Sequence, residues 1–122
     1  MGGGTGTGDD SILEEIDFYL VRECRSKIRL KVAKELKLKD LINSEKERLS
    51  VIERLLKDFG PSLIKKQKKQ NYLVELNIQM EGLPYTKNNM INEGSISLMD
   101  QYDLKVIEVI DELKEEVDSW PD

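Results

Sequence analysis

Apolar side chains recur at intervals of three or four residues over long stretches of the chain, which is the spacing of one face of an α-helix. Ser11 followed by Glu14 matches a capping box, so we expect the first helix to begin at Ser11. Phe18 and Tyr19 are expected to widen its apolar face. The face itself consists of Leu13, Ile16, Leu20, Cys24, Ile28, Val32 and Leu36. A pattern of this length favours a fold made of packed amphipathic helices.

Two later runs of apolar residues have heptad-like spacing, which is typical of the seams between helices in bundles and coiled coils. A break or a kink is expected at residues 37–40, before the second helix. Gly60-Pro61 is expected to end that helix, with Gly60 in the left-handed conformation and Pro61 opening the next helix. The second run, which Glu45 interrupts, consists of Ile42, Leu49, Ile52, Leu56 and Phe59. The last run consists of Val106, Ile110, Leu113, Val117 and Trp120.

The middle of the chain carries two overlapping patterns. Apolar and polar residues alternate over residues 74–80, which is typical of a strand. A face with helical spacing also runs from Leu73 to Met80, and a glycine followed by a proline just after it favours the end of a helix. We favour the helix. A short β-hairpin between residues 72 and 99, with its turn in the polar stretch after Pro84, stays open as the alternative.

The fold that these patterns predict is mainly α, either a small antiparallel helical bundle or a long helical hairpin, with three to four helices. The chain has 122 residues, which suits one domain with a core of its own. We expect a single helical domain at residues 9–122, preceded by a flexible Gly/Thr leader at residues 1–8. The sequence contains no apolar run of roughly 18 residues, so a membrane-spanning helix is not expected.

The leader contains the string GGGTGTG, which resembles the nucleotide-binding signature of the tubulin-like cell-division GTPases over seven residues. That resemblance would imply a bound nucleotide. A phosphate-binding loop needs a strand before it and a helix N-terminus that faces the phosphates. No strand is expected before Gly2, and Asp9 and Asp10 stand where a phosphate would approach. We therefore predict a flexible tail and no nucleotide cofactor.

The sequence contains no histidine and a single cysteine, Cys24. Catalytic triads that need an imidazole, and zinc sites built from several cysteines or histidines, are therefore excluded. Cys24 lies on the apolar stripe of the first helix, so we expect a buried and unreactive thiol. The acidic residues of the last helix are expected on its solvated face. We predict no catalytic residue, no metal site and no cofactor, and hence no enzyme activity.

Charge is segregated along the chain. Residues 22–69 include sixteen basic and seven acidic residues, a net charge of +9, whereas residues 70–122 have a net charge of −9. Basic segments of this kind can follow a nucleic-acid phosphate backbone, but few aromatic residues accompany this one, so a solvated face is favoured. The candidate phosphate-backbone patch is the run Lys65, Lys66, Lys68 and Lys69.

By elimination, we expect a non-catalytic protein-protein interaction or assembly module, acting as a subunit or adaptor of a larger complex or as a homo-oligomer. The ten residues of the two heptad-like runs are its expected partner interface. The alternative is a nucleic-acid-associated protein that binds the phosphate backbone through residues 22–69. Because no secretory signal is recognised, we expect a cytoplasmic protein, or a nuclear one in a eukaryote, without a membrane partner.

Overall fold

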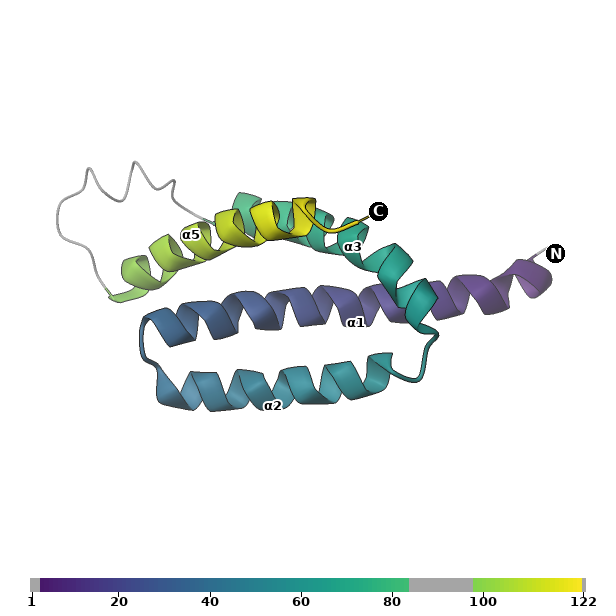
Figure 1. Ribbon diagram of the computed structural model, residues 1–122, viewed down its shortest axis with the longest axis horizontal. Coiled ribbons are helices and arrows are strands. Elements are labelled where there is room, and N and C mark those ends of the chain that lie inside the picture. The colour runs from purple at the N-terminus through teal and green to yellow at the C-terminus, as the bar shows by residue number, and fades with distance from the viewer. Residues whose placement is uncertain (1–2, 84–97, 122) are drawn as a thin grey trace.

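The computed structural model describes residues 3–83 and 98–121, and the regular structure in these ranges is entirely α-helical. The helices are α1 (Gly3–Glu35), α2 (Lys39–Leu56), α3 (Pro61–Glu81) and α5 (Leu98–Asp118) (Figure 1). The predicted mainly α helical bundle is confirmed.

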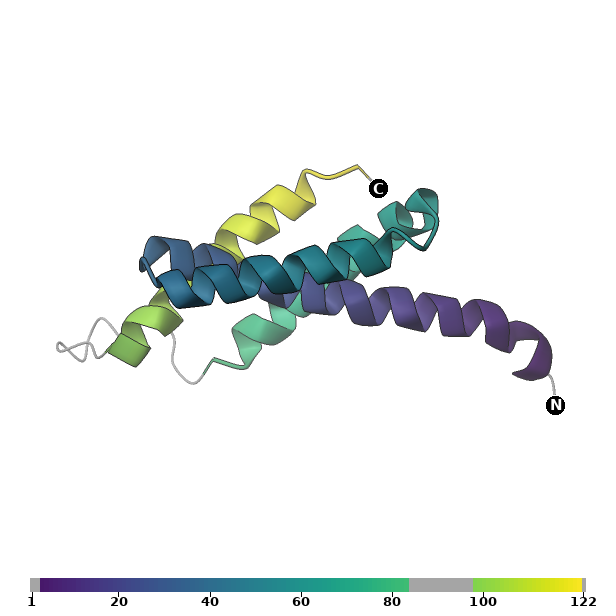
Figure 2. The same ribbon diagram turned by 90° about the horizontal axis from the view of Figure 1, so that it is seen from below.

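α1 is the central helix of the bundle. It packs against α2 on one side and against α3 and α5 on the other (Figure 1). α3 and α5 also pack against each other, whereas the principal contact of α2 is with α1. In both views the N-terminal end of α1 (purple) extends past the end of α2 (Figure 2). α2 is therefore held to the bundle mainly by one of its faces, and α1 has a stretch that α2 does not cover.

The predicted apolar runs become the buried faces of the helices. α1 contributes Ile16, Leu20, Cys24, Ile28 and Val32 to the core. The two heptad-like runs contribute Ile52, Leu56, Val106, Ile110, Leu113 and Val117. Tyr72 and Leu76 of α3 also belong to this cluster. Burying one large apolar side chain contributes about 1.5–3 kcal/mol, so packing, rather than the propensity of each helix, holds the fold together.

The predicted break after the first helix is confirmed, since α1 ends at Glu35 and α2 begins at Lys39. Leu38 N donates to Ala33 O at 2.9 Å and Lys37 N donates to Lys34 O at 3.3 Å, which is the hydrogen-bond pattern of a Schellman motif. Lys37 takes the left-handed position of that motif, with φ 58°. A lysine occupies the position where glycine is usual, and the chain reverses so that α2 returns along α1.

The predicted role of Gly60 is wrong, whereas the role of Pro61 is confirmed. Gly60 has φ −66° and ψ 134°, an extended conformation that precedes α3, and not the left-handed conformation. α2 ends at Leu56, so Gly60 lies too far along the chain to close that helix. Pro61 occupies the first turn of α3, where its missing N–H would have no helical partner.

The hairpin alternative is wrong for the described part of the chain, because residues 74–80 lie inside α3. Leu76 is fully buried and Leu73 and Met80 pack against the core, so the helical face buries more apolar surface than a strand without a partner. Residues 84–97, where the turn was placed, lie outside the described residues.

α1 begins at Gly3 and not at Ser11, so the predicted start of the first helix is wrong. A helix can extend through glycine and threonine when nothing breaks its hydrogen bonds, although glycine costs about 1 kcal/mol relative to alanine. The assignment of residues 1–8 to a flexible leader, separate from a domain at residues 9–122, stays a prediction.

Candidate interaction surface

Three buried glutamates join α1 to its neighbours. They are Glu23 of α1, Glu45 of α2 and Glu75 of α3. A buried carboxylate is unfavourable unless it accepts hydrogen bonds, and each of these accepts one from a side chain on another helix. Among the described residues, no buried side-chain nitrogen or oxygen lacks a hydrogen-bond partner. These contacts fix how α2 and α3 lie on α1, and so they position the outer surface of the bundle.

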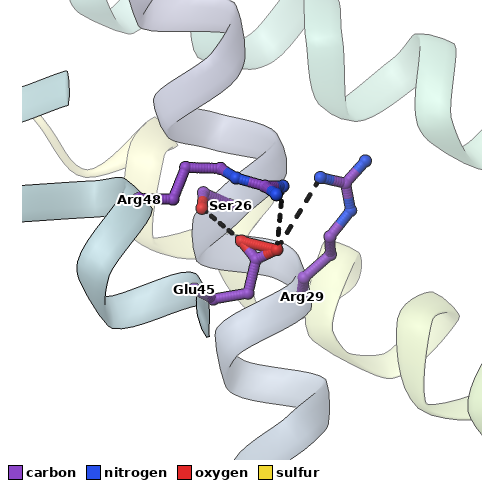
Figure 3. Close-up of polar contacts among 4 residues, drawn as sticks. All are labelled: Ser26, Arg29, Glu45 and Arg48. Carbon is purple, nitrogen blue, oxygen red and sulfur yellow. Dashed lines mark hydrogen bonds and ion pairs between the residues drawn. The ribbon is translucent and has the colours of Figure 1, made fainter. Parts of the chain in front are cut away.

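Glu45 is the residue that interrupts the apolar run of α2, and it faces Ser26 in the C-terminal half of α1 (Figure 3). The Ser26 hydroxyl donates to Glu45 Oε2. Arg48 Nη1 lies 3.1 Å and Arg29 Nη1 lies 3.9 Å from Glu45 Oε1. A shift of α2 along α1 would separate the buried carboxylate from its donors, so this contact sets the register between the two helices.

Tyr72 lies where α1, α3 and the chain end after α5 meet. Its hydroxyl donates to Glu23 Oε1, and Lys68 Nζ lies 3.5 Å from the same oxygen. The ring centroids of Tyr72 and Trp120 are 5.3 Å apart. Burial, followed by the Glu23 carboxylate, raises the pKa of Tyr72, so its phenol stays protonated and remains a donor.

Cys24 is free and buried in the core, which confirms the predicted burial. Burial, followed by the Glu75 carboxylate, raises the pKa of its thiol to about 12, so the reactive thiolate is scarce near neutral pH. We expect the native protein to resist alkylation by iodoacetamide at about pH 8 and to react readily once urea unfolds it, as measured by mass spectrometry. Equal rates in the two states would contradict this placement.

The outer side of α1 and α2 carries large apolar side chains that the described chain covers only in part. Phe18 is 53% exposed, Val51 44% and Leu55 38%. Val51 and Leu55 line a groove of about 440 Å³ between the two helices. We call this surface the α1/α2 face and define it by Phe18, Tyr19, Arg22, Val51 and Leu55.

Ring contacts hold the aromatic part of this face in place. Arg22 Cζ lies 4.2 Å from the centroid of the Phe18 ring, as in a cation–π contact. The Phe18 and Tyr19 rings meet edge to face at 5.6 Å, and the Tyr19 and Phe59 rings are 6.3 Å apart. Because Phe59 follows α2, these contacts mark where that helix ends against α1.

Ile12 extends the apolar surface beyond α2. It lies seven residues before Tyr19 and so on nearly the same side of α1. It is about 10 Å further toward the N-terminus than the point where Tyr19 meets Phe59. Its side chain is 41% exposed because α2 stops before reaching it.

The residues of the two predicted seams lie mainly inside the bundle. The buried ones are Leu49, Ile52, Leu56, Val106, Ile110, Leu113 and Val117. The half-buried ones are Ile42, Phe59 and Trp120. Their mutual contacts within one chain leave little of their surface for a partner in this fold. A partner interface built from these ten residues stays a prediction.

The four lysines of the predicted phosphate-backbone patch are in two different settings. Lys65 and Lys66 are exposed. Lys68 Nζ lies 5.6 Å from the Tyr72 ring centroid and 5.4 Å from the Trp120 ring centroid. Lys69 Nζ donates to Trp120 O at 2.9 Å. Lys68 and Lys69 therefore hold the chain end after α5 against α3.

Sequence reasoning missed the α1/α2 face and the three buried glutamates. Phe18 was expected to widen the buried face of the first helix, but its ring points away from the core. The one signal in the sequence was Glu45, because it is a charged residue at a seam position. A carboxylate buried at such a position needs a hydrogen-bond donor on the facing helix.

None of the described helices has a stretch that is both long and apolar enough to cross a membrane. In the same ranges, no group of three or more acidic or cysteine side chains is arranged to hold a metal ion. Comparison of the chain with models of known families, with curated proteins and with solved structures found no match. The function proposed below therefore rests on the physical features of the surface.

Proposed function

We propose that the chain is a non-catalytic interaction or assembly module that binds a protein partner through its α1/α2 face. The observation that carries this proposal is the exposed Phe18 ring, fixed by Arg22 beside a groove that Val51 and Leu55 line. As part of the same proposal, the module acts in the cytoplasm, where a free thiol such as that of Cys24 stays reduced.

The composition of the face suits a binding site. Aromatic residues and arginine are enriched at the energetic centres of protein interfaces, where a few anchors supply most of the affinity. Arg22 and Tyr19 already restrict the Phe18 side chain, so binding a partner costs little further side-chain entropy at this residue. The groove beside it offers an apolar wall for a partner side chain or helix, as in helix-in-groove recognition.

The nucleic-acid alternative rests on Lys65 and Lys66. Lys65 lines a second groove, of about 630 Å³, together with Lys27, Lys57 and Lys68. Glu23 and Glu53 line the same groove and offset part of its positive charge. Since Lys68 and Lys69 make contacts within the chain, the basic run offers a phosphate backbone fewer lysines than the sequence suggests.

Replacing Phe18 by glutamate is expected to abolish partner capture by the tagged full chain expressed in its native host. A charge at the centre of an apolar interface must lose its water on binding, and this desolvation costs far more free energy than the loss of the Phe18 contacts. The matched control is Val74→Glu, because Val74 is 52% exposed on α3, away from the α1/α2 face. Quantitative mass spectrometry should recover the same proteins, further copies of this chain included, with the wild type and with Val74→Glu.

Equal recovery with the wild type and Phe18→Glu would contradict the assignment of this face. Recovery of nucleic acid that falls steeply with salt, and that needs Lys65 and Lys66, would instead support the alternative. Circular dichroism of each variant checks that the fold is retained, which is expected because both residues are exposed.

A further inference from the structure

Two hollows of similar size and opposite charge flank the Phe18 and Tyr19 rings along α1. The hollow toward the N-terminus has a volume of about 460 Å³ and is lined by Glu14 and Glu15. The hollow toward the C-terminus is the groove of about 440 Å³ of the α1/α2 face. The charged residues that line this groove are Arg22, Arg48 and Glu47. Because Arg48 pairs with the buried Glu45 carboxylate at 3.1 Å, the positive charge that this groove offers a partner is mainly that of Arg22, whereas Glu14 and Glu15 make the other hollow acidic.

We propose that the partner of the α1/α2 face is a second copy of this chain, bound antiparallel about a two-fold axis that passes close to Phe18. This inference rests on the proposed function and adds the identity of the partner. A two-fold axis brings the same surface of both copies together. The acidic hollow of each copy then meets the arginine-lined groove of the other, so opposite charges face each other at two places in the interface.

The positions of two exposed charges determine the orientation. Glu15 lies three residues before Phe18 and Arg22 lies four residues after it, and residues seven apart share one stripe of a helix. An antiparallel pair centred on Phe18 places Glu15 of one copy within about 1.5 Å of the level of Arg22 of the other. A parallel pair would place like charges opposite each other, which disfavours that arrangement.

The antiparallel arrangement also accounts for the part of α1 that α2 leaves uncovered. α2 runs beside the C-terminal part of α1, and the N-terminal end of α1 extends past it (Figure 1). When two copies pair in opposite directions, the outer side of α2 in one copy lies beside the uncovered stretch of the other. Val51 and Leu55 then face the region of Ile12, so each copy covers the apolar side chains that its own α2 does not reach.

The test is sedimentation velocity of the purified full chain over a range of concentrations. We expect the wild type to pass from monomer to dimer as concentration rises, and Val74→Glu to behave in the same way. Phe18→Glu, Glu15→Arg and Arg22→Glu should each weaken association by about tenfold or more, because each introduces an unpaired or repulsive charge. The double variant Glu15→Arg with Arg22→Glu should restore part of the association, since the two charge pairs re-form with reversed sign while the contact of Arg22 with Phe18 stays lost.

A wild type that stays monomeric at every concentration would overturn self-association. The proposed function would still hold in that case if the capture of a different protein depends on Phe18. A dimer that is insensitive to Phe18→Glu and to both charge reversals would equally overturn the proposal, because the interface would then lie elsewhere. Thermal unfolding of each variant, followed by circular dichroism, separates loss of association from loss of folding.

Discussion

Replacing Tyr72 by alanine is expected to lower the free energy of unfolding by about 3–5 kcal/mol, the range for removing a buried aromatic ring. Tyr72 is fully buried in α3, and its ring packs against Trp120 while its hydroxyl donates to Glu23. The substitution removes the ring from the junction of α1, α3 and the segment after α5, and it also takes a donor from a buried carboxylate. Since small domains have about 5–15 kcal/mol of stability in total, this single change threatens the fold.

The matched variant Tyr72→Phe keeps the ring and removes only the hydroxyl. It should lower the free energy of unfolding by about 1–3 kcal/mol, because Glu23 loses its buried donor and keeps Lys68 at 3.5 Å. Urea denaturation followed by circular dichroism measures both variants. Equal effects of the two substitutions would contradict the packing of Tyr72 against Trp120, and no effect of either would contradict its burial.

Replacing Ile52 by alanine is expected to lower the free energy of unfolding by about 2–5 kcal/mol and to weaken partner binding at the same time. α2 packs mainly against α1, and the buried residues of that contact are Glu45, Leu49, Ile52 and Leu56. Ile52 also lines the groove beside Val51. A cavity at this position therefore loosens α2 and disturbs the proposed binding surface together.

The exposed neighbour Val51 provides the control. Val51→Ala should change the free energy of unfolding by no more than about 0.5 kcal/mol, because the side chain is only partly covered, while it still reduces partner binding. Hydrogen exchange should show residues 39–56 opening first in Ile52→Ala and not in Val51→Ala. Similar stability of the two variants would contradict the docking of α2 through one face.

Helices were predictable wherever buried residues recur at helical spacing. Ile16, Leu20 and Val32 are buried at helical spacing where α1 packs against its neighbours, and such a stripe is visible in the sequence. The break near Lys37 was visible for the same reason, since the stripe changes there. The choice between helix and strand at residues 74–80 was open, because both patterns fit and only packing on α1 decides between them.

The binding surface was not predictable, because exposure at Phe18 depends on where other helices end. Phe18 is apolar and aromatic like a core residue, yet about half of its side chain is exposed because the described helices cover it only in part. Similarly, the heptad-like run through Leu49 and Ile52 indicates a seam without indicating whether the facing helix belongs to the same chain. The buried position of Glu45 depends on Ser26, which lies nineteen residues earlier in the sequence.

Hydrogen exchange of the full chain, compared between dilute and concentrated solution, tests whether two copies of the chain meet through the α1/α2 face. We expect slower exchange at high concentration in the N-terminal half of α1 and the C-terminal half of α2, around Phe18 and Val51. Exchange around Val74 and Ile78 of α3 should not change, although these residues are also exposed and apolar. Protection confined to α3 or α5, or exchange that is identical at all concentrations, would contradict the pairing of two copies through this face.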